Sequence, residues 1–354
     1  MVNTHSVSGE EAEIASLLIK RMTELGYCTS IDKAGNVVGL IGEGSPRILL
    51  CGHMDTVPGA LPVTLEDGVL TGRGSVDAKG PLASLIIGGR QAILDGFNGS
   101  LTVVGAVDEE GQNKGVKELI KNDLKVDYAV FGEPTNVNTI TIGYKGAFSV
   151  KVKVTTEAGH SSAPWIYVNA IEAGMELYHS IKEMVTSMTD EKEGINAITV
   201  TLREIHGGGS HGTMPGECEM CIGFRIPNDI KTDSIVDVVK EEINTFDSRD
   251  ERIKIDLMVL DTAEPYLADK KNKLVKAFSR AIYTETSGLV TLVRKSGTGD
   301  MNYFGNITGT PCITYGPGDS HLDHTNKEQI LIEDYLEAIG VISKGLLFLE
   351  KLHA

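Results

Sequence analysis

Residues 47–55 read RILLCGHMD, and this stretch decides the fold class of the chain. After Arg47 it is a continuous apolar run, which is typical of a strand buried on both faces of a sheet. Similar apolar runs, and one segment with a helical pattern, lie nearby: strands 37–41, 101–107 and 128–131, and helix 81–94. Strands that alternate with helices predict an α/β fold with a mainly parallel sheet.

The N-terminal region carries a helix-start signal. Ser8-Gly9-Glu10-Glu11 matches a capping box, in which Ser8 is the N-cap and the side chain of Glu11 reaches back to it. The helix is expected to continue to about Leu25 and to end at Gly26.

From about residue 147 the pattern changes, because residues 148–154 alternate between polar and apolar as a half-buried strand does. Further elements are expected in this order: helix 167–188, strand 197–205, strand 218–226, helix 233–246 and strand 253–259. That order is the split βαβ, or ferredoxin-like, unit. The α/β pattern then returns with helix 273–285, strand 312–315 and a final helix from 332. We therefore expect a domain of residues 147–258 inserted into a domain of residues 1–146 and 259–354, which suits a chain of this length.

Composition excludes several classes of function. The chain has 33 basic and 49 acidic residues, a formal net charge of −16, and such a surface repels the phosphates of nucleic acids. No stretch approaches the ~20 apolar residues of a membrane span. The start, MVNTH, lacks the basic and apolar regions of a signal peptide, and the five scattered cysteines do not suggest disulfides. A cytoplasmic protein is expected.

Acidic and histidine residues follow several of the predicted strands. In a parallel sheet, functional groups gather where strands end at their carboxyl edge. The groups in such places are His53 and Asp55, Asp108 with Glu109 and Glu110, Glu133, Asp77 just before a helix, and the C-terminal loop with His321 and His324. Clustered carboxylates repel one another unless a cation neutralises them. Histidine and carboxylate ligands without cysteine favour a catalytic site for zinc, cobalt or manganese.

The adjacent pair Glu109 and Glu110 is informative. Neighbouring residues of a strand point to opposite sides, so the two carboxylates cannot do the same task. One is suited to bind metal, and the other to face the attacking water as a general base.

Four motifs, at 52–59, 72–80, 108–111 and 132–134, resemble the co-catalytic zinc aminoacylase family. That family includes acetylornithine deacetylase, succinyl-diaminopimelate desuccinylase and carboxypeptidase G. The motifs occur in the family's order, and the resemblance spans nearly the whole chain. It implies a zinc-peptidase-like catalytic domain, an inserted lid and dimerisation domain, and a homodimer.

The resemblance also implies a site for two divalent ions, zinc or cobalt. His53 and Glu133 would bind the first ion, Glu110 and His324 the second, and Asp77 would bridge them. His324 is preferred to His321 because HTNKE, residues 324–328, matches the family's His-Thr-x-x-Glu pattern. The family also has a cis peptide after its bridging aspartate.

Further roles are implied with less specific motifs. Glu109 would be the general base, and Asp55 would accept the other N–H of His53 and fix its tautomer. His160 matches a family histidine that stabilises an oxyanion across the dimer, with an exposed lid histidine as the alternative. Arg225 would hold a substrate carboxylate or form a structural salt bridge. Thr298 and Asp300 would border the substrate pocket, although Asp300 alone also fits a helix cap.

The expected activity is the hydrolysis of an amide that links an acyl group to an amino acid. Within the family, residues 294–302 and a glycine at 212, where many members have asparagine, look closest to the amino-group carrier protein lysine/ornithine hydrolase of lysine and arginine biosynthesis. Its substrate is carried on a small acidic protein, for which the candidate docking residues are Lys270, Lys271, Lys273, Lys276, Arg294 and Lys295. Alternatives are an acetylornithine or acetyllysine deacetylase, a succinyl-diaminopimelate desuccinylase and a dipeptidase. A non-catalytic metal-dependent binding protein is the other class, and it has no need of Glu109.

Overall fold

A computed structural model describes residues 1–354 and shows two compact units. The first contains Met1–Gly143, Leu267–Arg294 and Gly299–Ala354, and the second contains Tyr144–Tyr266 and Lys295–Thr298. The expected boundary at residue 259 falls inside a strand that continues to Ala263. Residues 295–298 join the second unit because the amide of Lys145 donates to the carbonyl of Lys295.

The first unit has six α-helices: α1 (Ala12–Glu24), α2 (Lys79–Leu94), α3 (Lys114–Lys121), α6 (Lys273–Thr286), α7 (Asp300–Thr308) and α8 (Ile332–His353). Its main sheet contains β1 (Cys28–Ile31), β2 (Val37–Ile41), β3 (Arg47–His53), β6 (Ser100–Ala106), β7 (Tyr128–Gly132), β8 (Thr139–Tyr144), β13 (Tyr266–Leu267), β14 (Thr291–Lys295) and β15 (Cys312–Thr314).

The centre of this sheet is parallel. Its order is β1-β2-β6-β3-β7-β15-β8-β13, with β14 beside β8. Strands β6, β3, β7 and β15 run parallel, while β2 joins one side and β8 the other in antiparallel fashion. Residues Ile48 to His53 of β3 are all buried, as expected of a strand covered on both faces. The prediction of an α/β fold with a mainly parallel sheet is confirmed.

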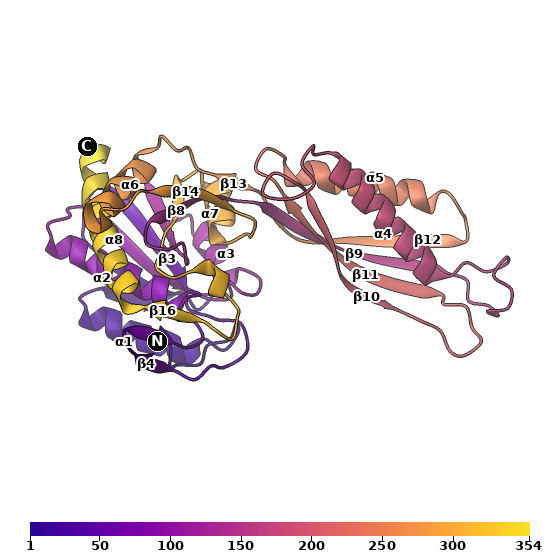
Figure 1. The fold of residues 1–354 in the computed structure, drawn as a ribbon, viewed down its shortest axis with the longest axis horizontal. Helices are drawn as coiled ribbons and strands as arrows, with labels where there is room; N and C mark the ends of the chain where they lie inside the picture. The colour runs from indigo at the N-terminus through magenta and orange to yellow at the C-terminus, as the bar shows by residue number, and fades with distance from the viewer. The chain divides into compact units, whose positions relative to one another are not determined.

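Helix α2 lies close to the end of β3. Helices α2, α6 and α8 pack together, and α2 also packs on β3 (Figure 1). A side chain at Gly52 would have its Cβ only 3.2 Å from the Cα of Leu82, so glycine permits this close approach. The approach brings the N-terminus of α2 beside the carboxyl end of β3.

The second unit has the ferredoxin-like order that the sequence predicts. Its elements are β9 (Gly146–Thr156), α4 (Ala170–Ser187), β10 (Thr199–Gly207), β11 (Glu217–Ile226), α5 (Thr232–Asp247) and β12 (Ile253–Ala263). The strands form an antiparallel sheet in the order β10-β11-β9-β12. Alternate residues of β9 and β11 form the core with α4 and α5, and the rings of Phe148 and Phe224 stack with centroids 4.3 Å apart.

One side chain ties together the two segments at which the chain enters and leaves the second unit. The amide nitrogen of Asn228 donates to the carbonyl of Tyr144 at 2.8 Å and to that of Tyr266 at 2.9 Å. Tyr144 ends β8 and Tyr266 begins β13, and these two strands are neighbours in the first unit's sheet.

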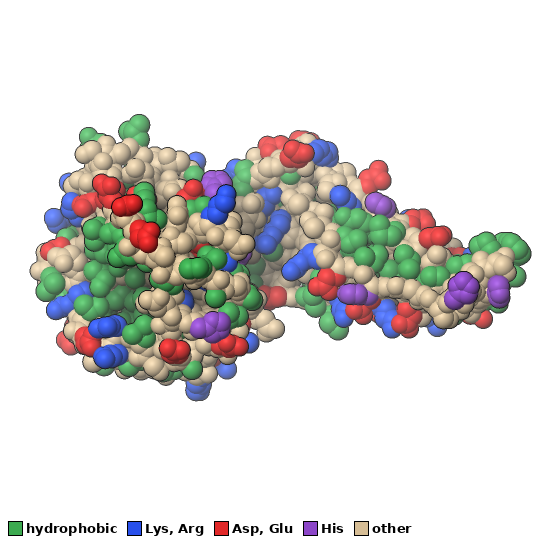
Figure 2. All heavy atoms as spheres, turned by 60° about the horizontal axis from the view of Figure 1, so that its bottom comes forward, with side chains coloured by type: hydrophobic (Ala, Val, Ile, Leu, Met, Phe, Trp, Pro, Cys, Tyr) green, Lys and Arg blue, Asp and Glu red, His purple; other side chains and the backbone are tan.

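A small sheet and the surface complete the description. Strands β16 (Gln329–Leu331), β5 (Val69–Thr71) and β4 (Thr64–Glu66) pair in that order, and the 3₁₀ helix η1 (Ser320–Leu322) precedes them in the C-terminal loop. None of the helices has the length and apolar character needed to cross a lipid bilayer. On the face drawn in Figure 2, acidic and basic side chains are interspersed rather than gathered into one basic region.

Candidate metal centre

Five segments bring polar side chains to the carboxyl edge of the parallel sheet. His53 is the last residue of β3, Glu133 follows β7, and Glu109 and Glu110 lie in the turn after β6. Because β6, β3 and β7 are parallel neighbours, these ends meet at one edge. Asp77, just before α2, and His324, just after η1, complete the cluster.

Five of these six residues, all except Glu109, form two overlapping sets of potential ligands. His53, Asp77 and Glu133 make one set, and Asp77, Glu110 and His324 make the other, each with its atoms within 4.8 Å of one another. The Nε2 atom of His53 lies 3.0 Å from Oδ1 of Asp77 and 3.6 Å from Oε1 of Glu133.

Asp77 belongs to both sets. Its Oδ2 lies 3.0 Å from Nε2 of His324, so its two oxygens face different imidazoles. Nε2 of His324 also lies 2.9 Å from Oε1 of Glu110. Imidazole nitrogens and carboxylate oxygens without thiolate suit zinc or cobalt, so this donor arrangement fits a pair of bridged divalent ions. The peptide bond between Asp77 and Ala78 is cis, as the family resemblance implies.

His321 is not part of this cluster. Its Nδ1 atom lies 2.7 Å from Oδ1 of Asp319, and its side chain is 90% exposed. The structure thus brings His324, and not His321, to the carboxylates.

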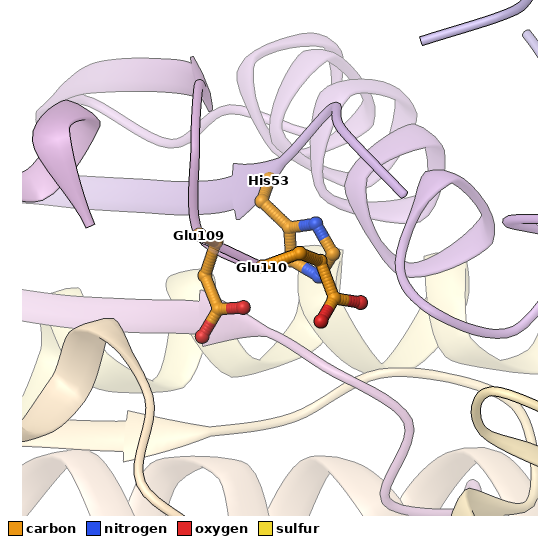
Figure 3. A group of neighbouring side chains, drawn as sticks. All are labelled: His53, Glu109 and Glu110. Carbon is orange, nitrogen blue, oxygen red and sulfur yellow. The ribbon is translucent and has the colours of Figure 1, made fainter. Parts of the chain in front are cut away.

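Glu109 lies beside the ligand sets. It forms a third potential group with His53 and Glu110. Figure 3 shows the carboxylates of Glu109 and Glu110 beside the ring of His53, and one oxygen of each lies within 4.8 Å of the other. The two residues lie in a turn and not in a strand, because β6 ends at Ala106 and Asp108 adopts a left-handed conformation with φ of 60°. The expectation that they are strand neighbours pointing to opposite sides is therefore wrong, since both carboxylates join one group with His53.

Asp55 is fully buried and contacts His53 differently from the expectation. Nδ1 of His53 lies 3.0 Å from the backbone carbonyl of Asp55 and 3.6 Å from its Oδ1. A hydrogen bond from Nδ1 to this carbonyl leaves Nε2 facing Asp77 and Glu133. The Asp55 carboxylate instead accepts hydrogen bonds from the amides of Glu109 and Glu110, at 3.2 Å and 3.1 Å.

Sequence reasoning missed Glu328 and Arg73. Glu328 is fully buried, and its Oε1 accepts hydrogen bonds from the amides of Val76 and Asp77, both at 3.0 Å. Its Oε2 accepts a 2.7 Å hydrogen bond from Nη1 of Arg73. Glu328 thereby fixes the backbone that presents Asp77. The signal was the final residue of HTNKE, which was used only to select His324.

Burial and the charges of neighbouring groups shift the pKa values of the acidic side chains in the site. Burial raises the pKa of Glu109 well above its usual value, and the charges of Glu133 and Asp300 act in the same direction. Burial and Asp77 also raise the pKa of Glu110. Burial opposes ionisation of Asp77, but hydrogen bonds from His324 and His53 outweigh it and lower the pKa of Asp77. A cation is the natural neutraliser of such a cluster.

The same carboxylates raise the pKa values of the two histidines. The hydrogen bond with Asp77 raises the pKa of His324 to about 9, with a further contribution from Glu110. Burial opposes protonation of His53, but the charge of Glu133 and the nearby carboxylates of Asp55 and Asp77 raise the pKa of His53 well above its usual value.

Asp300 is the first residue of α7 and lies in the first unit. Its Oδ1 accepts a 3.2 Å hydrogen bond from the Asn113 side chain, which also donates to the carbonyl of Glu109 at 3.3 Å. Burial raises the pKa of Asp300 to about 7. The helix-cap alternative does not apply, since the N-cap of α7 is Gly299.

The other three expected site residues belong to the second unit. His160 is exposed, and its Nδ1 lies 2.8 Å from the hydroxyl of Ser162. Nη1 of Arg225 donates to the hydroxyl of Thr298 at 2.9 Å. Arg225 therefore has a hydrogen-bond partner within its own unit.

Known proteins similar to this chain have names consistent with this site. A protein of Thermococcus kodakarensis, named as a candidate [LysW]-lysine/[LysW]-ornithine hydrolase, is 35% identical over 97% of this chain and 88% of its own length. The [LysW]-lysine hydrolase of Deinococcus radiodurans is 31% identical over 98% of this chain and 94% of its own length. The structure of a Staphylococcus aureus tripeptidase superposes with a TM-score of 0.84 at 20% identity, over 99% of this chain and 96% of that one.

The sequence profile of Peptidase family M20/M25/M40 matches residues 49–347, which include every residue of the two ligand sets. With a match over most of its length and relatives above 30% identity along nearly all of it, the chain belongs to Peptidase family M20/M25/M40.

Proposed function

We propose that this protein is a two-metal amidohydrolase that releases lysine or ornithine from a carrier protein to which the amino acid is linked by an amide bond. The observation that carries the reaction class is Asp77, whose two oxygens face the imidazoles of His53 and His324 and so join two ligand sets. The substrate is inferred from the names of the relatives in Thermococcus kodakarensis and Deinococcus radiodurans.

His53, Asp77 and Glu133 would hold one ion, and Asp77, Glu110 and His324 the other, with zinc or cobalt the preferred metals. Bound there, two divalent ions polarise the amide carbonyl and lower the pKa of the attacking water.

Two acidic residues of the protein would transfer the proton and position the other groups of the site. Glu109 is close to both ligand sets without being needed in either, so it is the group to take a proton from the water and return it to the leaving amine. Asp55 holds the amides of Glu109 and Glu110 and, through its carbonyl, the ring of His53.

Four further residues are proposed to contact the substrate. Asp300 and Thr298 would border the bound amino acid, Arg225 would contact a carboxylate group of the substrate, and His160 would stabilise the oxyanion. In support, Nδ1 of His160 is occupied by Ser162, which leaves its Nε2 as the nitrogen to donate.

The test is an assay of the purified protein, loaded with zinc or cobalt, against carrier-linked lysine, carrier-linked ornithine, acetylornithine and succinyl-diaminopimelate. We expect the carrier-linked substrates to have the highest kcat/KM. Glu109→Gln should keep both metal ions but lose roughly 10²–10⁴-fold in kcat, since general-base catalysis contributes that much. A Glu109→Gln variant with full activity and full metal content would remove the base assignment. Faster turnover of acetylornithine would reassign the substrate.

A small acidic carrier needs a basic docking surface on this acidic protein. Lys270, Lys271, Lys273 and Lys276 are all exposed at the start of α6, and Arg294 and Lys295 end β14. We infer that these residues attract the carrier, because long-range charge complementarity accelerates association.

Charge reversal tests this docking surface. The variant Lys273→Glu with Lys276→Glu should raise KM for carrier-linked lysine about tenfold at low salt and less at high salt. It should not change turnover of a small acylated lysine. The matched control is Lys20→Glu with Lys121→Glu, two exposed lysines of α1 and α3 that alter net charge equally. Equal effects of the two double variants, or none from the first, would contradict the docking surface.

We also propose that the protein is a homodimer. Strand β10 lies at one edge of the second unit's sheet, and an edge strand offers unpaired backbone groups to a partner.

A further inference from the structure

The capping-box residues at the start of α1 do not cap the helix. The helix begins at Ala12, its N-cap is Glu11, and no side chain caps it. The hydroxyl of Ser8 instead donates to Oδ2 of Asp55 at 2.7 Å. Oε1 of Glu11 accepts hydrogen bonds from the amide of Gly9 at 2.9 Å and from the amide of Asp108 at 3.2 Å. Two residues that the sequence assigns to a local helix start therefore make contacts near the metal centre.

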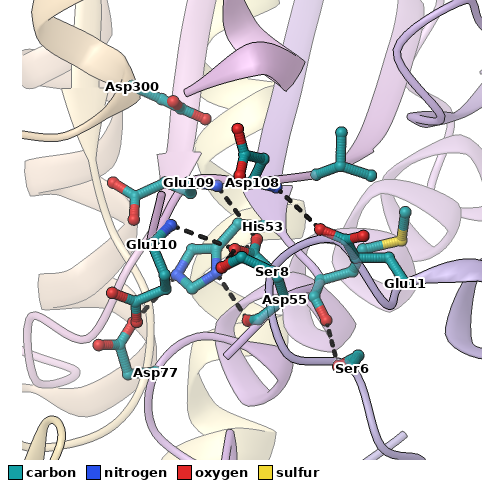
Figure 4. Close-up of polar contacts among 12 residues, drawn as sticks. Ser6, Ser8, Glu11, His53, Asp55, Asp77, Asp108, Glu109, Glu110 and Asp300 are labelled. Carbon is teal, nitrogen blue, oxygen red and sulfur yellow. Dashed lines mark hydrogen bonds and ion pairs between the residues drawn. The ribbon is translucent and has the colours of Figure 1, made fainter. Parts of the chain in front are cut away.

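Three successive amides of the turn after β6 donate to two carboxylates. The amide of Asp108 donates to Glu11, and those of Glu109 and Glu110 donate to the two oxygens of Asp55, at 3.2 Å and 3.1 Å (Figure 4). The turn contains a non-glycine residue with positive φ, Asp108, and such a conformation persists only where its surroundings hold it. Glu11 and Asp55 supply that support by accepting hydrogen bonds from three successive amides of the turn.

The Asp55 carboxylate needs donors because it is fully buried, and burial of an unpaired charge is costly. The amides of Glu109 and Glu110 supply two, and Ser8 supplies a third to Oδ2, the oxygen that also accepts from Glu110. Loss of the Ser8 hydroxyl would leave Oδ2 with the amide of Glu110 as its donor.

The segment that contains Ser8, just before α1, is attached to the backbone next to Asp55. The amide of Thr56 donates to the carbonyl of Ser6 at 2.9 Å, and the hydroxyl of Ser6 donates to the carbonyl of Met54 at 2.8 Å. Val7 and Thr56 form a parallel bridge. Ser6 thus attaches the segment to the backbone after β3 without contacting a carboxylate of the site, which makes it a matched control for Ser8.

We propose that Ser8 and Glu11 are positioning residues for the general base Glu109 and the ligand Glu110. Ser8 acts through the carboxylate of Asp55, and Glu11 acts through the amide of Asp108. This inference rests on the proposed function for its catalytic consequence, while its consequence for metal binding does not depend on the substrate.

The first test compares Ser8→Ala, Ser8→Thr and Ser6→Ala in the full-length, metal-loaded protein. Partners behind metal ligands typically contribute 10–100-fold, so Ser8→Ala should lower both kcat and the affinity for the second zinc ion by about tenfold, with KM unchanged. Zinc affinity is measured by competition with a chromophoric chelator. Ser8→Thr keeps the hydroxyl and should restore both values, and Ser6→Ala should change only the melting temperature.

The second test asks whether Glu11 holds the turn through the oxygen that accepts from the amide of Asp108. Glu11→Gln retains an acceptor for the amide of Asp108 and should keep nearly full kcat, whereas Glu11→Ala should lower kcat about tenfold without a matching change in KM.

The outcomes distinguish the alternatives. Equal losses in Ser6→Ala and Ser8→Ala would overturn the proposal, because attachment of the segment would then be the cause. Wild-type zinc affinity and kcat in Ser8→Ala and Glu11→Ala would overturn it directly. If the wild-type protein hydrolyses none of the amides tested, the proposed function fails, and a tenfold loss of zinc affinity in Ser8→Ala would still support the positioning role.

Discussion

Asp77 is placed by contacts on every side. Its two carboxylate oxygens face His53 and His324, and its amide donates to the buried carboxylate of Glu328. The hydrogen bond to Glu328 fixes the backbone at Asp77 and thereby the directions in which its two carboxylate oxygens point. The same holds for Glu109 and Glu110, whose amides are held by Asp55.

Asp300 leads to a prediction on pH dependence at the residue scale. Burial raises the pKa of Asp300 from 3.8 to about 7 in the folded protein. Between about pH 4 and pH 7 the folded state therefore retains a proton that the unfolded chain has released, and stability falls as pH rises through this window. Asp300→Asn removes this loss and keeps an acceptor for Asn113.

The measurement is the melting temperature of metal-free wild-type and Asp300→Asn protein from pH 4 to pH 8. The variant should melt higher than wild type above pH 7, by roughly 2–4 °C for each kcal/mol relieved, and the difference should vanish near pH 4. A difference that is the same at both ends of the range would argue against the titration of Asp300.

Single residues were predictable where a short motif contained them. His53, Asp77, Glu110, Glu133 and His324 all lie in such motifs, and the structure brings all five together. Glu328 lies in the same motif as His324, but its role could not be predicted because its partner Arg73 is 255 residues away along the chain. Ser8 was assigned to a helix cap because local spacing cannot reveal a competing acceptor 47 residues away.

At the scale of elements, the buried pair of Arg73 and Glu328 joins the loop before α2 to the segment before β16. Glu328→Ala would leave the guanidinium and the amides of Val76 and Asp77 without their acceptor. Breaking a buried pair in this way costs roughly 3–5 kcal/mol of unfolding free energy.

Urea denaturation of the metal-free protein checks this value. The control is Asp127→Ala, which breaks the more exposed pair of Asp127 and Arg47 and should cost less than about 1 kcal/mol. Similar costs for the two variants would contradict the prediction that burial of the Arg73–Glu328 pair decides its contribution.

Long, strongly patterned elements were predictable, and short ones were not. The expected strand 37–41 corresponds to β2, the apolar run that follows Arg47 corresponds to β3, and the helix expected at 81–94 corresponds to α2. Strands β4, β5 and β16 have three residues each, too few for a periodic pattern. They exist because they pair with one another, and that pairing is not encoded locally.

At the scale of the molecule, each unit has its own hydrophobic core. The second unit's core consists of residues of β9 to β12 with α4 and α5, and none of the potential metal ligands lies in it. Metal should therefore stabilise the first unit alone. Binding at a hundredfold excess over Kd contributes about 2.7 kcal/mol per site.

Scanning calorimetry with and without a chelator tests this. We expect two transitions, of which only one moves to lower temperature when metal is removed. In His53→Ala that transition should be less sensitive to the chelator, and the other should remain where it is. One transition that shifts as a whole, or a chelator-sensitive second unit, would show that the two cores do not unfold separately.

The change of hydrophobic period near residue 147 predicted the division into two units. It did not predict where the second unit ends. β12 continues through residue 259 to Ala263, since its last residues still pair with β9. Residues 295–298 belong to the second unit through contacts with Lys145 and Arg225, which only tertiary structure reveals.

The amide of Asn228 gives the second unit a topological property. It holds together the carbonyls of Tyr144 and Tyr266, the two ends of the longer segment of the second unit. Strands β8 and β13, which flank that segment, are already neighbours in the sheet. Residues 145–265 thus begin and end beside each other, and a short hairpin in their place would leave β8 and β13 as neighbours in the first unit's sheet. All five residues of the two ligand sets lie outside this segment, so its length and sequence can change in evolution while those sets stay the same.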